Sequence, residues 1–183
     1  KSYQFDVVKK QKLNEVHQSY KKYTKLIYQE LSKAGRWQQT CQLISKLNAH
    51  TAKPKLSDLK NFTLDYDEES FLTHLSYETD LFELTAKSIE WQTEQDRAFI
   101  AGGWLEYLTA SLLVAENIRD ISLSVEIAKS TQRVHAKTHQ EIDVMAMQQQ
   151  QLLIIECKTV NWKNATQASE AIYKLSALRD IGG

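Results

Sequence analysis

Three charged residues in the last third of the chain have types and spacing that suit metal-assisted chemistry. Asp143 and Glu156 lie in segments that otherwise favour apolar residues, and Lys158 follows Glu156 by two positions. Two carboxylates offer oxygen ligands, which suit a hard cation such as Mg²⁺ or Mn²⁺. Such a metal polarises a phosphoryl oxygen and helps to deprotonate a water, while a lysine stabilises the charge that builds on the phosphate. The residues therefore predict hydrolysis of a phosphodiester bond.

A predicted hairpin brings these residues together. If Gln149-Gln150 forms a two-residue turn, Asp143 faces Glu156 across the strands and Glu141 faces Lys158. Directly opposed residues point to the same side of a sheet, so three carboxylates and one ammonium would share a patch. Gln-Gln is not a favoured turn dipeptide, and a three-residue loop would shift the pairing by one residue and separate the faces. The register is therefore a hypothesis.

The neighbours of these residues leave several readings open. The carbonyl of Cys157 is a candidate further metal ligand, while the Cys157 side chain alternates away from the site and is expected to be buried. Glu141 is either an extra ligand or a neutralising partner for Lys158. The alternative to a functional site is an ordinary strand end, where Glu156 and Lys158 form an ion pair exposed to solvent. The apolar run before Glu156, and an aspartate one hairpin arm away, favour the site.

An α/β core is predicted to position the site. Thr93 is a good N-cap for its first helix, and Gly102-Gly103 inside that helix indicate that another backbone packs close. The last strand has an apolar run that predicts cover on both faces, and Ile172 lies on the apolar side of the closing helix. The expected elements are a helix, three strands in an antiparallel or mixed sheet, and a helix, at residues 93–116, 121–127, 141–147, 152–159 and 165–180.

Residues 1–92 are predicted to form a small helical bundle that precedes this core. A long helix over 7–34 carries an apolar stripe from Leu13 to Ile27, which is either a dimer seam or a face packed inside the bundle. A second helix starts at Trp37, and an acidic helix start follows at Asp65. The predicted domains are therefore 1–92 and 93–183.

The charge is unevenly spread although the net charge is zero. Residues 1–60 hold 13 Lys and Arg against 4 Asp and Glu. This basic segment could touch nucleic acid or an acidic partner. The alternative is a solvent-exposed helix face whose lysines pair with the acidic segment at 61–100. We favour this alternative, because a net charge of zero argues against a protein dedicated to binding a phosphate backbone.

The length and composition of the chain restrict the class of protein to which it can belong. A length of 183 residues suits one domain, or one domain with a helical attachment. No apolar run approaches the roughly 18 residues that span a bilayer, so no membrane contact is expected. Cys41 and Cys157 make no disulfide framework, which favours a reducing, cytoplasmic location. The start without Met, and the end at Gly183, indicate a piece of a longer protein.

Four sequence blocks occur in a recognisable order and spacing, and Leu153-Ile-Ile-Glu-Cys-Lys-Thr159 is the most specific of them. Together they resemble the nuclease domain of the CRISPR ancillary nucleases that carry an N-terminal CRISPR-associated Rossmann-fold (CARF) sensor. The resemblance implies a restriction-endonuclease-like fold of the PD-(D/E)XK type. It assigns metal binding to Asp143 and Glu156, catalysis to Lys158, and the completion of the acidic cluster to Glu106. The other three blocks are Gly102–Tyr107, Glu141–Val144 and Tyr173–Asp180 with Gly182-Gly183.

The resemblance also implies partners. In such proteins a sensor domain binds a cyclic oligoadenylate, and the nuclease then cuts DNA, RNA or both as a homodimer. No strand–helix alternation precedes residue 95, so the sensor is expected to lie outside this chain, as are strands that follow Gly183. Two alternatives stay open: a catalytically silent module that binds nucleic acid or a partner, and a repair or transposition endonuclease with the same core.

Several further residues carry weaker signals. Trp162 either stacks on a base or fills the core, and Lys174 and Arg179 either contact phosphate or are ordinary helix-surface charges. His135 and His139 have the spacing of two zinc ligands, but no third ligand accompanies them, so a loop between strands is the preferred reading. By pattern alone Glu106 is a solvent-facing glutamate, and only the resemblance singles it out.

Overall fold

The computed structural model describes residues 5–51, 57–58, 64–85, 88–129 and 140–159, together with residues 169, 172, 173 and 176. The chain divides into two compact units. We call His17–Leu108 the helical unit, and Lys1–Val16 with Thr109–Gly183 the sheet unit. Each unit is described by itself.

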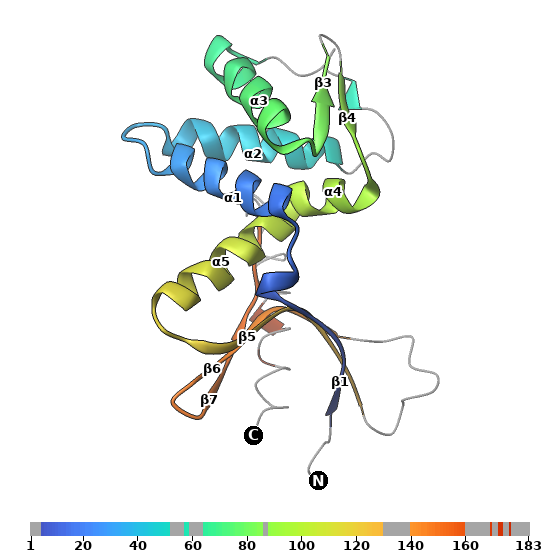
Figure 1. Ribbon diagram of the computed structural model, residues 1–183, viewed down its shortest axis with the longest axis vertical. Coiled ribbons are helices and arrows are strands. Elements are labelled where there is room, and N and C mark those ends of the chain that lie inside the picture. The colour runs from blue at the N-terminus through green and yellow to red at the C-terminus, as the bar shows by residue number, and fades with distance from the viewer. Residues whose placement is uncertain are drawn as a thin grey trace. The chain divides into compact units, whose positions relative to one another are not determined.

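Antiparallel strands form the centre of the sheet unit (Figure 1). Their order across the sheet is β1-β5-β6-β7, so the first strand of the chain lies beside a strand more than 100 residues later. Apolar side chains that alternate along β5 and β6 are buried, as a half-buried sheet requires. They include Leu123, Val125, Ile127, Ile142, Val144 and Ala146. The strands are β1 Phe5–Lys12, β5 Arg119–Lys129, β6 Gln140–Gln148 and β7 Gln151–Ile155.

The β6–β7 hairpin has the predicted register. Gln149 and Gln150 form the two-residue turn, with φ angles of 48° and 68°. Positive φ at both central positions is typical of the type I′ turn, whose twist matches the flanking strands. Gln148 pairs with Gln151 and Met145 with Ile154, as predicted. Pairing of the two flanking strands thus imposes a turn that the Gln-Gln dipeptide does not favour by itself.

The predicted helix over residues 7–34 is wrong in its first part. Residues 5–12 form β1, which pairs with β5, and the 3₁₀ turn η1, Leu13–Glu15, separates this strand from α1, Gln18–Leu31. The consecutive valines Val7 and Val8 suit a strand, and pairing with β5 overrides the local helical spacing. The sheet therefore has four strands in the described residues, where three were predicted.

The third predicted strand is shorter than expected. β7 ends at Ile155, and Glu156–Thr159 continue without ladder pairing among the described residues. Leu152 is 45% exposed, so the prediction of cover on both faces is wrong. Ile172 is helical, as predicted, but it is 64% exposed and does not lie on a covered face. Most of the predicted helix 165–180 lies outside the described residues.

The helical unit contains a small sheet as well as helices, and the predicted helical bundle did not include these strands. β2, β4 and β3 form an antiparallel sheet in that order (Figure 1). Tyr23 and Ile27 are buried within this single chain, so that part of the apolar stripe packs inside its own fold. The elements are α1, α2 Trp37–Thr51, β2 Ser57–Asp58, α3 Tyr66–Thr79, β3 Phe82–Leu84, β4 Ser88–Trp91 and α4 Glu94–Ala98.

The predicted helix that starts after Thr93 is present, with a local change of pitch. The Thr93 hydroxyl accepts a hydrogen bond from the Asp96 amide, which confirms the N-cap. A π-helical turn, η3 Phe99–Gly103, joins α4 to α5, Trp104–Ala115. A Cβ at Gly103 would meet the ring of Phe99 at 3.0 Å, and no described atom lies within 4 Å of one at Gly102. The predicted close backbone is therefore wrong among the described residues.

The helical stretch Glu94–Ala115 has 22 residues and is long and apolar enough to cross a bilayer by length and composition alone. The prediction that no segment approaches this length is wrong in that respect. The stretch is weak evidence for a membrane span, because core helices of soluble proteins meet the same criterion. It also contains Asp96, which accepts a buried hydrogen bond from Tyr20, and Glu106; ionisable groups are costly in a bilayer.

Candidate active site

The charged residues predicted to share a site come together at the open end of the β6–β7 hairpin. The last pair of the ladder is Val144 with Ile155, so Asp143 and Glu156 occupy the next position in the register. Asp143 is 8% exposed. The Glu156 side chain is 4% exposed, and that of Lys158 is 39% exposed. Two buried carboxylates thus lie beside a partly exposed ammonium.

Hydrogen bonds and charge hold these groups in place. The Cys157 amide donates to Asp143 Oδ2 at 2.6 Å, which ties the segment after β7 to β6. Lys158 Nζ lies 3.9 Å from the same Asp143 oxygen and forms an ion pair with Glu156 Oε1. The hairpin therefore places one ammonium beside two carboxylates, as the predicted register requires.

The environment of Lys158 favours its charged form. Desolvation by burial acts to lower the pKa of Lys158, but the hydrogen bond to Glu156 and the negative charges of Asp143 and Glu156 outweigh it. The net result is a pKa above the ordinary value of lysine. Lys158 therefore acts as a fixed positive charge, suited to stabilising a developing negative charge rather than to accepting a proton.

The side chain of Cys157 has a contact that sequence reasoning missed. Cys157 is partly exposed, so its predicted burial is wrong, and its Sγ lies 3.6 Å from the hydroxyl of Thr109 on α5. This contact links α5 to the segment that carries Glu156 and Lys158. No periodicity or motif singles out Thr109, because a threonine on a helix face is ordinary in sequence.

The other predicted site residues differ in how far the structure describes them. Glu106 is partly buried in the first turn of α5 and belongs to the helical unit, whereas Asp143, Glu156 and Lys158 belong to the sheet unit. Glu141 is exposed on β6, where it pairs in register with Glu126 of β5. The remaining candidates lie outside the described residues: Trp162, Lys174, Arg179, His135 and His139.

The donor set at the hairpin end fits a hard divalent cation in type but is incomplete as a metal site. Asp143 and Glu156 supply carboxylate oxygens, the ligands that Mg²⁺ and Mn²⁺ prefer. Across the described part of the chain, no group of three or more His, Cys, Asp or Glu side chains is arranged to hold a metal ion. Backbone carbonyls, waters or a further carboxylate would have to complete the coordination.

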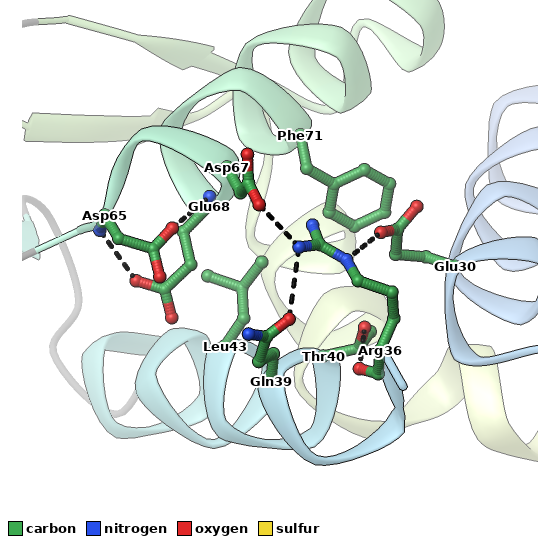
Figure 2. A pocket seen from close by; sticks show the side chains of 9 residues that line it. All are labelled: Glu30, Arg36, Gln39, Thr40, Leu43, Asp65, Asp67, Glu68 and Phe71. Atoms are coloured by element: carbon green, nitrogen blue, oxygen red, sulfur yellow. Dashed lines mark hydrogen bonds and ion pairs between the residues drawn. The ribbon is translucent and has the colours of Figure 1, made fainter. Parts of the chain in front are cut away.

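A second charged cluster lies in the helical unit, around a small open pocket. Arg36 lies at its centre, where it donates to Glu30 on α1 at 3.0 Å and to Asp67 on α3 at 2.7 Å (Figure 2). Asp65 caps α3 by accepting from the Glu68 amide, and the Glu68 side chain accepts from the Asp65 amide in return. The pocket is lined by Glu30, Arg36, Gln39, Thr40, Leu43, Asp65, Asp67, Glu68 and Phe71.

These contacts indicate a structural role for the pocket cluster. Glu30 is 5% exposed, and Lys33 as well as Arg36 bonds it. Desolvation by burial acts to raise the pKa of Glu30, but its bonds to Lys33 and Arg36 outweigh this and hold the pKa below the ordinary value. The cluster thus joins α1 to α3 through Arg36, the residue before α2.

Comparisons with solved structures find proteins of similar fold. A crystal structure of protein VC1899 from Vibrio cholerae matches with a TM-score of 0.70 and 24% identity over 92% of this chain. Can2 from Sulfobacillus thermosulfidooxidans, solved in complex with cyclic tetra-adenylate, matches with a TM-score of 0.64 and 22% identity over 98% of this chain. The chain spans 45% of the length of each of these two proteins. At these identities the likeness establishes the fold alone.

A comparison with protein families adds a sequence-level match, whereas a search of curated proteins gives none. The match covers residues 93–183, which include Glu106 and the whole β6–β7 hairpin. The matching family is described as "Card1-like, endonuclease domain". Residues 93–183 thus match the Card1-like endonuclease family, which points to nuclease activity for this part of the chain.

Proposed function

We propose that this chain carries the catalytic centre of a metal-dependent endonuclease that hydrolyses phosphodiester bonds of nucleic acid. In this proposal Asp143 and Glu156 hold Mg²⁺ or Mn²⁺, and the carbonyl of Cys157 is a further ligand. Glu106, from α5, completes the acidic cluster. The bound metal would polarise the phosphoryl oxygen and favour deprotonation of the attacking water.

The observation that carries the proposal is the convergence of Asp143, Glu156 and Lys158 at one hairpin end. The Cys157 amide donates to Asp143 Oδ2 at 2.6 Å, which orients that carboxylate. Lys158 lies beside both carboxylates and is held in its charged form. From there the ammonium can stabilise charge on the phosphate or orient the water. The family match over residues 93–183 supports the same reaction class.

The biological setting is part of the proposal. We infer a CRISPR-associated defence nuclease of the PD-(D/E)XK type, activated by a cyclic oligoadenylate that binds a CARF sensor domain outside this chain. Support comes from the fold that the chain shares with Can2, which was solved with cyclic tetra-adenylate, and from the 45% of Can2 that the chain spans. A homodimer, cutting of DNA, RNA or both, and a cytoplasmic location belong to the same proposal.

A catalytically silent binding module is the alternative that one observation favours. Lys158 pairs directly with Glu156, and the described residues offer no group of three metal-binding side chains. In a silent module this ion pair would be permanent. In the nuclease, metal binding would compete with Lys158 for Glu156 and move the ammonium towards the substrate.

The test is cleavage of circular single-stranded DNA, supercoiled plasmid and labelled RNA by the full-length protein. Each substrate is incubated with Mn²⁺ or EDTA, with and without cyclic oligoadenylates, beside the Lys158→Ala variant. Metal-dependent cutting that Lys158→Ala lowers by about 10²-fold or more supports the enzyme, and a requirement for the activator supports the defence setting. Failure of folded wild-type protein to cut under every condition would favour the silent module.

A further inference from the structure

The basic run near the start of the chain lies on the same sheet as the candidate active site. Lys9, Lys10 and Lys12 belong to β1, which forms one edge of the sheet beside β5. All three lysines are exposed. From the sequence alone, these lysines were predicted to lie on a solvent-exposed helix face. Their position on the sheet instead allows them to face the same ligand as the candidate active site.

The strand register shows which face of the sheet two of these lysines share with Asp143. Lys9 pairs with Glu126 of β5, and Glu126 pairs with Glu141 of β6. Asp143 is two residues beyond Glu141 on the same strand. Directly paired residues point to the same face, and residues two apart on a strand do so as well. The register of β1 shifts on both sides of Lys9, so the face of Lys9 is fixed by its ion pair with Glu126 at 3.1 Å rather than by alternation along β1. Lys9 and Asp143 therefore lie on one face.

A second row across the sheet gives the same result for Lys12. Lys12 pairs with Ser122 of β5, and Ser122 pairs with Met145 of β6, two residues beyond Asp143. Asp143 thus lies on β6 between Glu141 and Met145, and the rows through these neighbours reach β1 at Lys9 and Lys12. The two lysines flank the row of Asp143 at the exposed edge of the sheet.

The spacing of these rows suits contact with a nucleic-acid backbone. Neighbouring strands lie about 4.8 Å apart and residues rise about 3.3 Å along a strand, so each lysine backbone lies roughly 12 Å from that of Asp143. The axial rise of one strand in a B-form duplex is about 3.4 Å per nucleotide, so such a strand covers that distance within at most about four nucleotides. A strand whose scissile phosphate lies beside Asp143 can therefore present further phosphates to β1.

We propose that Lys9 and Lys12 bind the phosphate backbone of the nucleic-acid substrate along β1, an inference that rests on the proposed nuclease function. Lys9 is paired with Glu126 at 3.1 Å, and the Lys9 side chain is 71% exposed. Exposed ion pairs contribute little to stability, so replacing the Glu126 carboxylate with a phosphate as the partner of Lys9 costs little free energy. Glu126 then acts as a competitor that holds Lys9 in position until substrate binds.

Edge protection is the competing explanation, because lysines on edge strands also prevent sheets from pairing with one another. The two explanations differ in what a charge-removing variant changes. Loss of edge protection raises aggregation and leaves the salt dependence of nucleic-acid binding unchanged. Loss of a phosphate contact lowers that salt dependence, by about 0.7 in the slope of log K against log salt for each contact with a single strand.

The experiment measures binding of fluorescein-labelled single-stranded DNA and RNA by fluorescence anisotropy over a range of salt concentrations. The full-length Lys158→Ala protein is used in EDTA, so that binding is read without cleavage. Lys9→Gln and Lys12→Gln are each expected to weaken binding severalfold, with the slope reduced by about 0.7 per lysine. In cleavage assays on otherwise wild-type protein, each should raise KM and leave kcat unchanged.

Lys22→Gln is the matched control, because Lys22 forms a similarly exposed ion pair with Glu78 in the helical unit. This control should keep both affinity and slope. Glu126→Gln should tighten binding, and this gain should vanish when Lys9→Gln is also present. An equal effect of Lys22→Gln, an unchanged slope in both β1 variants, or aggregation alone would overturn the proposal. If the wild-type protein never cuts but the β1 variants still alter the slope, the nuclease proposal fails and the binding surface stands.

Discussion

The two charged clusters of this chain differ in what their contacts join. In the helical unit, Arg36 connects Glu30 on α1 to Asp67 on α3, across 31 positions between Arg36 and Asp67. At the hairpin end, Asp143, Glu156 and Lys158 belong to one hairpin whose strands are already paired by their ladder. The first cluster holds separate elements together. The second places two carboxylates opposite each other on a hairpin whose strands are already paired. Repulsion between the carboxylates is unfavourable for folding but suits binding of a cation.

Removing the ammonium at the hairpin end should have a large effect on activity. Lys158→Ala is expected to lower the cleavage rate by about 10²–10³-fold, because a positioned donor that stabilises transition-state charge has that effect in other enzymes. Initial rates on the preferred substrate measure it. Lys46→Ala is the control, since Lys46 pairs with Glu68 in the helical unit; a comparable loss of cleavage in that variant would contradict the assignment.

Removing a carboxylate in the helical unit should change stability instead. Glu30→Gln is expected to lower the free energy of unfolding by about 1.5–3 kcal/mol, because bonds from Lys33 and Arg36 to a buried charge are weakened. Urea unfolding measures the change, and cleavage per folded molecule should stay at the wild-type value. A stable Glu30→Gln protein with reduced cleavage would reverse the roles assigned to the two clusters.

The pH dependence of stability sharpens the same contrast. The pKa of Glu30 is held below its ordinary value of 4.5 by its bonds to Lys33 and Arg36, which outweigh desolvation. A lowered folded-state pKa stabilises the fold above the unfolded-state pKa, and this contribution is lost as the pH falls through the folded-state value. We therefore expect the wild-type protein to lose part of its stability below about pH 4.5, and Glu30→Gln to lose less over that range. Parallel pH profiles for the two proteins would refute this.

The smallest effect is expected at Thr109. Thr109→Val keeps the shape of the side chain but removes the hydroxyl 3.6 Å from Cys157 Sγ, so the segment that carries Lys158 is held less firmly. A contact worth about 0.5–1 kcal/mol corresponds to a rate reduced roughly two- to fivefold, measured as kcat with KM unchanged. Thr109→Ser should retain the wild-type rate. Thr73→Val, on the exposed face of α3, is the control, and an equal loss there would mean that no positioning role exists.

The hairpin was predictable from sequence because its information is local. A single turn at Gln149-Gln150 fixes the whole register, from Gln148 with Gln151 to Val144 with Ile155. The convergence of Asp143, Glu156 and Lys158 follows from that register. Glu106 needed a family resemblance, because by spacing alone it is one of many glutamates on helices.

The strand β1 was not predictable because its partner is remote. Phe5 pairs with Lys129, and nothing within residues 5–12 signals that pairing. The contact between Thr109 and Cys157 escaped for the same reason, since it joins a helix to a segment 48 positions later. Both contacts join segments that are far apart in the sequence, so neither could be predicted from local pattern. The residues around the site were therefore harder to predict than the charged groups of the hairpin.

Cleavage by matched carboxylate-to-amide variants tests the central claim most directly. Asp143→Asn and Glu30→Gln each remove one charge from a buried carboxylate and preserve its shape, and both are compared with wild type in Mn²⁺ and in EDTA. We predict cleavage that requires Mn²⁺, that Asp143→Asn abolishes, and that Glu30→Gln retains. Cleavage that persists in EDTA, or that Asp143→Asn leaves unchanged in folded protein, would contradict the assignment of the hairpin end as a metal-dependent nuclease centre.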